Sequence, residues 1–150
     1  MRKFFIFLTI MLIATHVFCT PRDEYLGTWI LEDPLIFSDS IYDIDATKYS
    51  GLKIHYCDEE IMIGQKTLQI TKKRERKWNS AHLQNETKTS SFNGITFATL
   101  GIDNESVRVY TFKTNERKNL PGFFIILIDE NNMITMTGGV YYRMRRVDKL

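Results

Sequence analysis

The sequence predicts an all-β domain, most simply an antiparallel up-and-down barrel of about eight strands with one or two short helices. Short runs of alternating or continuous apolar residues recur from Tyr25 to Arg146, and turn residues such as Asn119-Leu120-Pro121-Gly122 separate them. No repeat with a period of about 20 to 50 residues is present. Short antiparallel strands fit a sandwich or a barrel. A barrel of about eight strands has an interior that side chains fill or that holds one small ligand.

Residues 1–19 differ from the rest of the chain. Arg2-Lys3 precedes an apolar stretch over residues 4–14, and a less apolar tail ends at Cys19. This order is typical of a secretory signal peptide. The apolar stretch is also shorter than the roughly 20 residues that a membrane-spanning helix needs. We therefore expect a signal peptide over 1–19.

Cleavage after Cys19 would leave a secreted or extracytoplasmic barrel domain over 20–150, with no membrane span. Cleavage at Ala14-x-His16, lipidation of Cys19 and an uncleaved signal anchor are the alternatives. The whole chain has 20 basic and 18 acidic residues, and two of the basic residues lie in 1–19, so the domain carries no net charge. Without a global basic field, nucleic acid is not an expected partner.

The domain keeps one cysteine, Cys57, which excludes an internal disulfide framework. We expect a buried, inert thiol; a nucleophile or an intermolecular bridge is the alternative. His55 shares a strand face with Cys57, but no third group orients it as a catalytic base. His16 leaves with the signal peptide, so a site of three histidines is excluded.

Other polar motifs do not favour catalysis or metal binding either. Asp43-x-Asp45 lacks the glycine and the terminal glutamate of a calcium loop. The acidic residues of 58–60 and 129–130 occupy expected turns. No glycine-rich phosphate loop follows a strand. We therefore expect a non-enzymatic protein without a cofactor or metal.

The first strand is expected over 25–31 and ends at Glu32-Asp33-Pro34, because proline cannot donate a hydrogen bond to a sheet. A connection then crosses one end of the barrel, with Asp45 as the N-cap of a short helix that stops at Gly51. Later strands are predicted over 52–57, 61–63, 67–71, 106–114, 123–128, 133–137 and 140–146.

Residues 72–91 are polar and begin with five cations and one acid over 72–77. A solvated hairpin end is the favoured interpretation, with weak contact to an anionic cell surface as the alternative. Trp78 is expected to fold back over apolar surface. Residues 95–102 predict one helical turn that stops at Gly101. The six apolar residues of 123–128 predict a strand buried on both faces.

Gly27-Thr28-Trp29 in the first strand and Tyr142-Arg143-Met144-Arg145-Arg146 in the last resemble the lipocalin (calycin) superfamily. More narrowly, the chain resembles a group of small secreted bacterial lipocalin-like proteins. Further fragments occur in the same order: Tyr49-Ser50-Gly51, Ile54-His55-Tyr56, Leu100-Gly101-Ile102 and Gly139-Val140-Tyr141-Tyr142. The stretch 72–91 departs from this pattern.

The resemblance implies a structural closure of one barrel end by Gly27, Trp29 and Arg146. An arginine or lysine of the last strand would pack over the tryptophan; Arg146 is the first choice and Arg145 the second. An indole needs a partner for its N–H when buried, and a guanidinium stacks on its face. Trp29 is therefore expected to hold the fold rather than to contact a ligand.

The barrel interior is the remaining candidate site. Its expected lining is Leu31, Ile54, Tyr56, Leu68, Ile70, Val109, Ile134, Met136, Tyr142 and Met144. We expect these residues to bind a small apolar or amphipathic molecule in a monomer, with Tyr56 and Tyr142 as polar tips. The alternative is a filled barrel that works as a protein-interaction module, an enzyme inhibitor or a cell-envelope partner, through residues 34–50 and 72–91.

Overall fold

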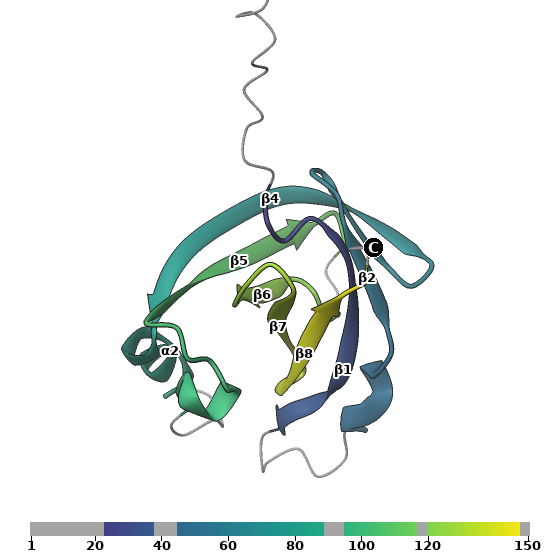
Figure 1. Cartoon of the computed structure of the whole chain (residues 1–150). Helices are drawn as coiled ribbons and strands as arrows, with labels where there is room; N and C mark the ends of the chain where they lie inside the picture. Colours follow the sequence, from purple (N-terminus) through teal and green to yellow (C-terminus); the bar gives the residue numbers. More distant parts are fainter. Residues whose placement is uncertain (1–22, 38–44, 89–94, 117–119, 148–150) are drawn as a thin grey trace, which may run out of the picture.

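A computed structural model of the chain describes residues 23–37, 45–88, 95–116 and 120–147. In this structure eight antiparallel strands form a closed barrel in which sequence neighbours pair and β1 pairs with β8 (Figure 1). The strands are β1 (Gly27–Phe37), β2 (Lys53–Tyr56), β3 (Glu60–Ile63), β4 (Lys66–Asn79), β5 (Ser106–Thr114), β6 (Phe124–Leu127), β7 (Asn132–Thr137) and β8 (Val140–Arg146). The helical elements are η1 (Ala46–Tyr49), α2 (Ser80–Thr87) and η2 (Ala98–Leu100). The predicted all-β, lipocalin-like barrel is confirmed.

One apolar cluster, the barrel core, takes side chains from all eight strands and therefore fills the interior. The period of two in a strand places alternate side chains inside. On β8, Val140, Tyr142 and Met144 face inward and are at most 1% exposed, whereas Tyr141 belongs to a different cluster.

That second cluster, the outer core, lies on the outer face of β5 to β8. The strands contribute the residues that alternate with the inward ones, and the segment after β4 covers them. Figure 1 places α2 and the green segment of residues 95–102 beside the end of β4. The buried members are Trp78, Leu83, Ile95, Phe97, Leu100, Ile102, Val107, Val109, Ile126, Ile134 and Tyr141.

The prediction of a solvated hairpin end over 72–91 is wrong, because this stretch contains the end of β4 and the helix α2. β4 continues to Asn79 and α2 begins at Ser80. The Asn79 side chain caps the helix by accepting a hydrogen bond from His82 N at 2.9 Å, which satisfies one of the free N–H groups of the first turn. Trp78 packs in the outer core and is 7% exposed, so it covers apolar surface as predicted. Residues 89–91 lie outside the described part.

A bulge interrupts β4 at Thr71. The pairing with β5 passes from Ile70↔Thr114 to Lys72↔Lys113, which leaves Thr71 without an opposite residue. A bulge shifts the alternation of a strand by one residue. Inward side chains therefore have even numbers before Thr71 and odd numbers after it, so Lys72 points outward.

β1 is longer than predicted and begins later. It starts at Gly27 rather than Tyr25, and it continues past Pro34 to Phe37. Its pairing with β8 is irregular on both sides of Pro34, whereas the ladder with β2 ends at Ile30. A proline is tolerated here because this part of the strand has no β2 partner that needs the missing N–H.

The turn η1 confirms the predicted short helix after Asp45. The Asp45 side chain accepts a hydrogen bond from Thr47 N at 3.0 Å. Tyr142 Oη donates to Ala46 O at 2.7 Å, which attaches η1 to the last strand. Residues 38–44 of the connection predicted to cross one barrel end lie outside the described part of the chain. The helical turn before Gly101 is also confirmed as η2.

Candidate functional site

Trp29 and Arg146 close one end of the barrel. The two residues are opposite each other on β1 and β8, and the guanidinium lies over the indole with 4.4 Å from Cζ to the ring centroid. Trp29 Nε1 donates to Tyr25 O at 2.8 Å, and Arg146 Nη1 donates to Leu26 O at 2.6 Å. Gly27 has a φ of 120°, which side-chain-bearing residues rarely adopt. The pair thus holds the turn before β1 across the barrel end.

The segment 23–26 forms the outer part of this closure. Tyr25 is fully buried, and its ring centroid lies 4.7 Å from that of Tyr110. Asp23 pairs with Lys73 of β4, and Glu24 pairs with Arg108 of β5. These ion pairs bind the start of the domain to the β4–β5 ribbon.

The Asp23–Lys73 hydrogen bond shifts the pKa of each partner in the direction that favours its charged form. The hydrogen bond from Lys73 lowers the pKa of the Asp23 carboxyl below its ordinary value of 3.8. The same hydrogen bond raises the pKa of Lys73 above 10.5. Both groups are therefore charged across the range in which proteins usually work.

A turn between β5 and β6 enters the barrel and is held by Tyr56. Tyr56 Oη donates to Gly122 O at 3.0 Å, and Gly122 N donates to Thr135 Oγ1 at 2.8 Å. A Cβ at Gly122 would lie 2.9 Å from Ile54 Cδ1, and the φ of 96° is one that side-chain-bearing residues rarely adopt, so glycine is favoured here. Burial raises the pKa of Tyr56 well above 10, which keeps its hydroxyl a donor. The polar tip expected for a ligand is occupied by the protein's own backbone.

The structure divides the ten expected lining residues into two groups. Seven belong to the barrel core, with Ile70 partly buried at its margin: Leu31, Ile54, Tyr56, Leu68, Ile70, Tyr142 and Met144. Val109, Ile134 and Met136 belong to the outer core, which corrects their assignment to the barrel interior. On β5 the inward residues are Tyr110 and Phe112, which alternate with the outward Val109.

The inward lining residues are packed against one another. The six that are fully inside have exposed fractions of 0 to 1%. A side chain that lines a water-sized cavity inside the barrel would keep exposed area toward it, so the near-zero exposure of these six indicates that they line no such cavity within the barrel. Their arrangement can stabilise the barrel but offers no ready volume to a ligand.

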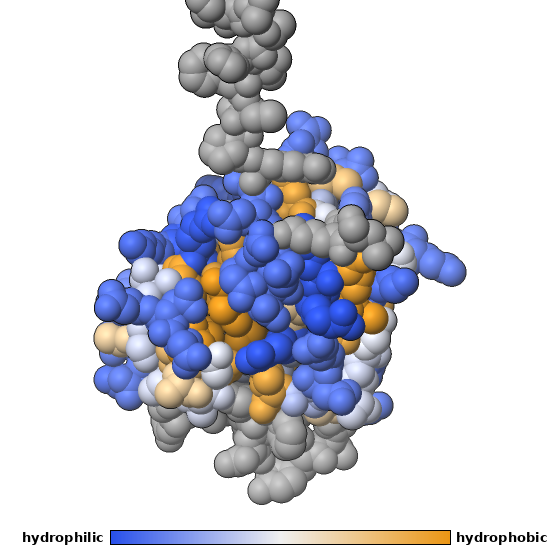
Figure 2. Space-filling view, viewed as in Figure 1, coloured by the Kyte–Doolittle hydropathy of each residue, from blue (hydrophilic) through white to orange (hydrophobic). Residues whose placement is uncertain are grey.

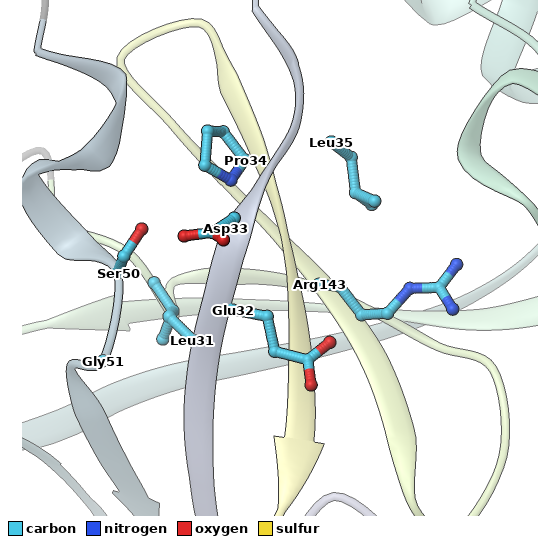
Figure 3. A pocket seen from close by; sticks show the side chains of 8 residues that line it. All are labelled: Leu31, Glu32, Asp33, Pro34, Leu35, Ser50, Gly51 and Arg143. Atoms are coloured by element: carbon cyan, nitrogen blue, oxygen red, sulfur yellow. The ribbon is translucent and has the colours of Figure 1, made fainter.

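A concavity of about 580 Å³ lies outside this core, at the irregular part of β1 (Figure 3). Its lining is Leu31, Glu32, Asp33, Pro34, Leu35, Ser50, Gly51 and Arg143. Arg143 lies on the opposite side of β1 from Ser50 in Figure 3 and points away from it. Arg143 Nη2 donates to Leu100 O at 3.4 Å, and Arg145 pairs with Glu32. The charged groups do not converge on one point, so no binding centre is defined.

A groove of about 330 Å³ lies along the β4–β5 ribbon. Its lining is Lys72, Arg74, Arg76, Thr111, Phe112 and Lys113. Four of these six side chains are cationic and none is acidic. The cations of 72–77 are evident in the sequence, whereas the strand register that places only some of them on one face is not.

Among the described residues, no hydrogen bond joins Cys57 to His55. Cys57 is free and only half-buried, which corrects the expectation of a buried thiol. His55 Nδ1 lies 2.8 Å from Thr28 Oγ1, within hydrogen-bond distance. The described residues contain no group of three or more histidine, cysteine, aspartate or glutamate side chains that could hold a metal ion.

Within the described residues, no helix combines the length and apolar character needed to cross a membrane. Comparisons with protein-family models, curated proteins and solved structures find no match to this chain. We therefore infer the function from the geometry of the barrel and its surface.

Proposed function

We propose that this chain is a secreted, non-enzymatic binding module of the lipocalin (calycin) type, similar to small secreted bacterial lipocalin-like proteins. Its barrel is filled, and it acts through its outer surface on a partner outside the cell. The observation that carries this proposal is the packing of the barrel core, where six of the seven inward lining residues are at most 1% exposed.

Two further observations support a filled barrel. The Gly122 turn occupies interior space that a ligand would need, and Tyr56 binds that turn. At the closed end, the rings of Tyr25, Tyr110 and Phe112 pack with centroid separations of 4.7 to 6.4 Å. Aromatic pairs at such separations are favourable contacts in their own right.

The secreted location is supported by the signal-like segment 1–19. If cleavage follows Cys19, Asp23 becomes the fourth residue of the mature chain. The closure formed by 23–26 lies entirely downstream of this position, so the mature domain would keep it intact.

Native mass spectrometry of the protein secreted by its own host tests the proposal. We expect the mass of residues 20–150 without a bound small molecule. Recurrent co-purification of an apolar molecule that is lost only on unfolding would contradict the filled barrel and favour the predicted barrel ligand. A mass that retains 1–19 would contradict signal cleavage.

A cavity-forming variant gives this experiment a positive control. Met144→Ala removes a fully buried side chain from the barrel core and should leave a dry cavity there. We expect xenon, used as a small apolar probe, to bind Met144→Ala but not the unchanged protein. Equal binding of the probe to both proteins inside the barrel would contradict the proposal.

A further inference from the structure

The bulge at Thr71 builds a row of cations on the outside of the barrel. After the bulge, Lys72, Arg74 and Arg76 share the outward face of β4, and Lys113 is opposite Lys72 on β5. Alternate residues of a strand are about 7 Å apart, so the row extends over about 14 Å. In Figure 2 hydrophilic side chains gather at the upper left of the molecule, where Figure 1 places part of β4, with hydrophobic patches beside them.

None of these four cations has an acidic partner among the described residues. The ion pairs of the same ribbon use inward or edge cations instead: Lys73 with Asp23, Arg108 with Glu24, and Lys66 with Glu116. The only acid between the cations, Glu75, is opposite Tyr110 and therefore lies on the inward face. The positive charge of the outer face is thus left available to a ligand.

The surroundings of the groove restrict the kind of anion that fits. The nearby rings of Phe112 and Trp78 are 5% and 7% exposed, so neither offers a platform for stacking a nucleic-acid base. Met62 on β3 is the only large hydrophobic side chain counted as exposed in the described part of the chain. A membrane-binding surface usually inserts several apolar side chains, which this face lacks.

We propose that the β4–β5 groove binds an acidic polysaccharide, whose sulfate or carboxylate groups lie along the cation row. This inference deepens the proposed function and rests on its claim that the outer surface is the binding surface. Arg74 and Arg76 suit this role because a guanidinium binds a planar or tetrahedral oxyanion with two parallel hydrogen bonds. Thr111, opposite Arg74, adds a hydroxyl to the lining.

Heparin fragments of defined length are the probe for this site. The test variant is Lys72→Gln/Arg74→Gln/Arg76→Gln. The control, Lys53→Gln/Lys77→Gln/Lys88→Gln, removes the same charge from exposed residues outside the groove. We expect the test variant to bind a heparin fragment longer than about 14 Å at least tenfold more weakly than the unchanged protein. Each cation close to an anionic ligand contributes to the binding free energy, and the variant removes three. The control should change affinity less than threefold.

Salt and fragment length sharpen the result. The slope of log affinity against log salt should decrease in magnitude by about three in the test variant and by less than one in the control. A fragment that spans only one cation should bind at least tenfold more weakly than one that spans the row. Equal effects of the two triple variants, or no dependence on length, would overturn the proposal.

Competing ligands separate this site from other polyanion surfaces. Single-stranded DNA of equal charge and vesicles with anionic lipids are offered to the unchanged protein under the same conditions. Stronger binding of either ligand, or no heparin binding at 150 mM salt, would overturn the polysaccharide assignment. If native mass spectrometry found a small molecule inside the barrel, the filled-barrel proposal would fail but the heparin comparison would still stand. None of the substituted residues belongs to the barrel core.

Discussion

The barrel core and the outer core use the same strands but are built in different ways. The barrel core is closed: its hydrogen bonds connect residues far apart in sequence, such as Tyr56 with Gly122 and Arg146 with Leu26. The outer core covers one side of the barrel, and α2 contributes only Leu83 and Thr87 as buried residues. The barrel core should therefore control folding of the domain, whereas the outer core should be the first part to open.

Trp29→Ala should have the largest effect, because the indole belongs to the closure of the barrel core. Loss of a fully buried tryptophan costs about 3–5 kcal/mol, against a total stability of about 5–15 kcal/mol. We expect Tm to fall by about 10 °C or more. Differential scanning calorimetry measures this change, and Trp29→Phe serves as a milder variant if the alanine variant does not fold.

The second tryptophan provides the matched control. Trp78→Ala removes the same side chain from the outer core, where it is 7% exposed instead of fully buried. We expect a smaller decrease in Tm than for Trp29→Ala. An equal or larger decrease would show that the outer core is as important for folding as the barrel core.

Leu83→Ala should open the outer core while the barrel persists. Leu83 is 1% exposed and is the main apolar contact of α2, so its truncation should cost about 2–4 kcal/mol locally. Hydrogen exchange should show lost amide protection over 80–87 and 95–102, with protection in β1 to β3 retained. Uniform loss of protection across all strands would mean that the two cores open as one unit.

Tyr56→Phe should weaken the barrel core without emptying it. The substitution removes the hydroxyl that donates to Gly122 O and leaves a buried carbonyl without this donor, at a cost of about 1–2 kcal/mol. Tyr49→Phe is the control, because Tyr49 is only partly buried and makes ring contacts that phenylalanine preserves. Urea denaturation should show a lower midpoint for Tyr56→Phe alone; equal midpoints for both variants would contradict the role of the Tyr56 hydroxyl.

Because the barrel core and the outer core bury apolar residues of the same strands, the sequence could predict the strands but not always which face of a strand points inward. Local signals mark hairpins, and Gly138-Gly139 between alternating runs indeed joins β7 to β8. The inward face of β5 could not be identified in this way. Val107 and Val109 on one face and Tyr110 and Phe112 on the other are all buried, so alternation separates the faces without showing which one is inside.

Two other features gave weak local signals. The bulge in β4 lies where polar residues follow one another, so nothing in their hydropathy marks Thr71. Helix α2 has Leu83 as its only large apolar residue and lacks an amphipathic pattern; its available signal was the N-cap Asn79 before Ser80. The candidate groove depended on the bulge, because the register after Thr71 decides which cations share a face.

Asp23→Asn should have the smallest effect, since its ion pair with Lys73 closes the barrel from the outside. The two side chains are 33% and 39% exposed, so solvent screens their attraction and the loss should be about 1 kcal/mol or less. The pKa of Asp23 is lowered in the folded state. Its stabilising contribution is therefore present above the ordinary value of 3.8 and is lost as the pH falls through the folded pKa.

The Lys73 pKa is raised, so its contribution persists below 10.5 and is lost only as the pH rises through the folded pKa. Urea denaturation should thus give a constant difference between Asp23→Asn and the unchanged protein from about pH 5 to pH 9. The difference should shrink below about pH 3, where the native carboxyl also becomes protonated. Asp58→Asn, an exposed turn substitution, controls for the loss of one charge. A difference that persists undiminished at low pH would show that Asp23 acts through its shape and neutral hydrogen bonds, and not through the ion pair that joins the barrel end to β4.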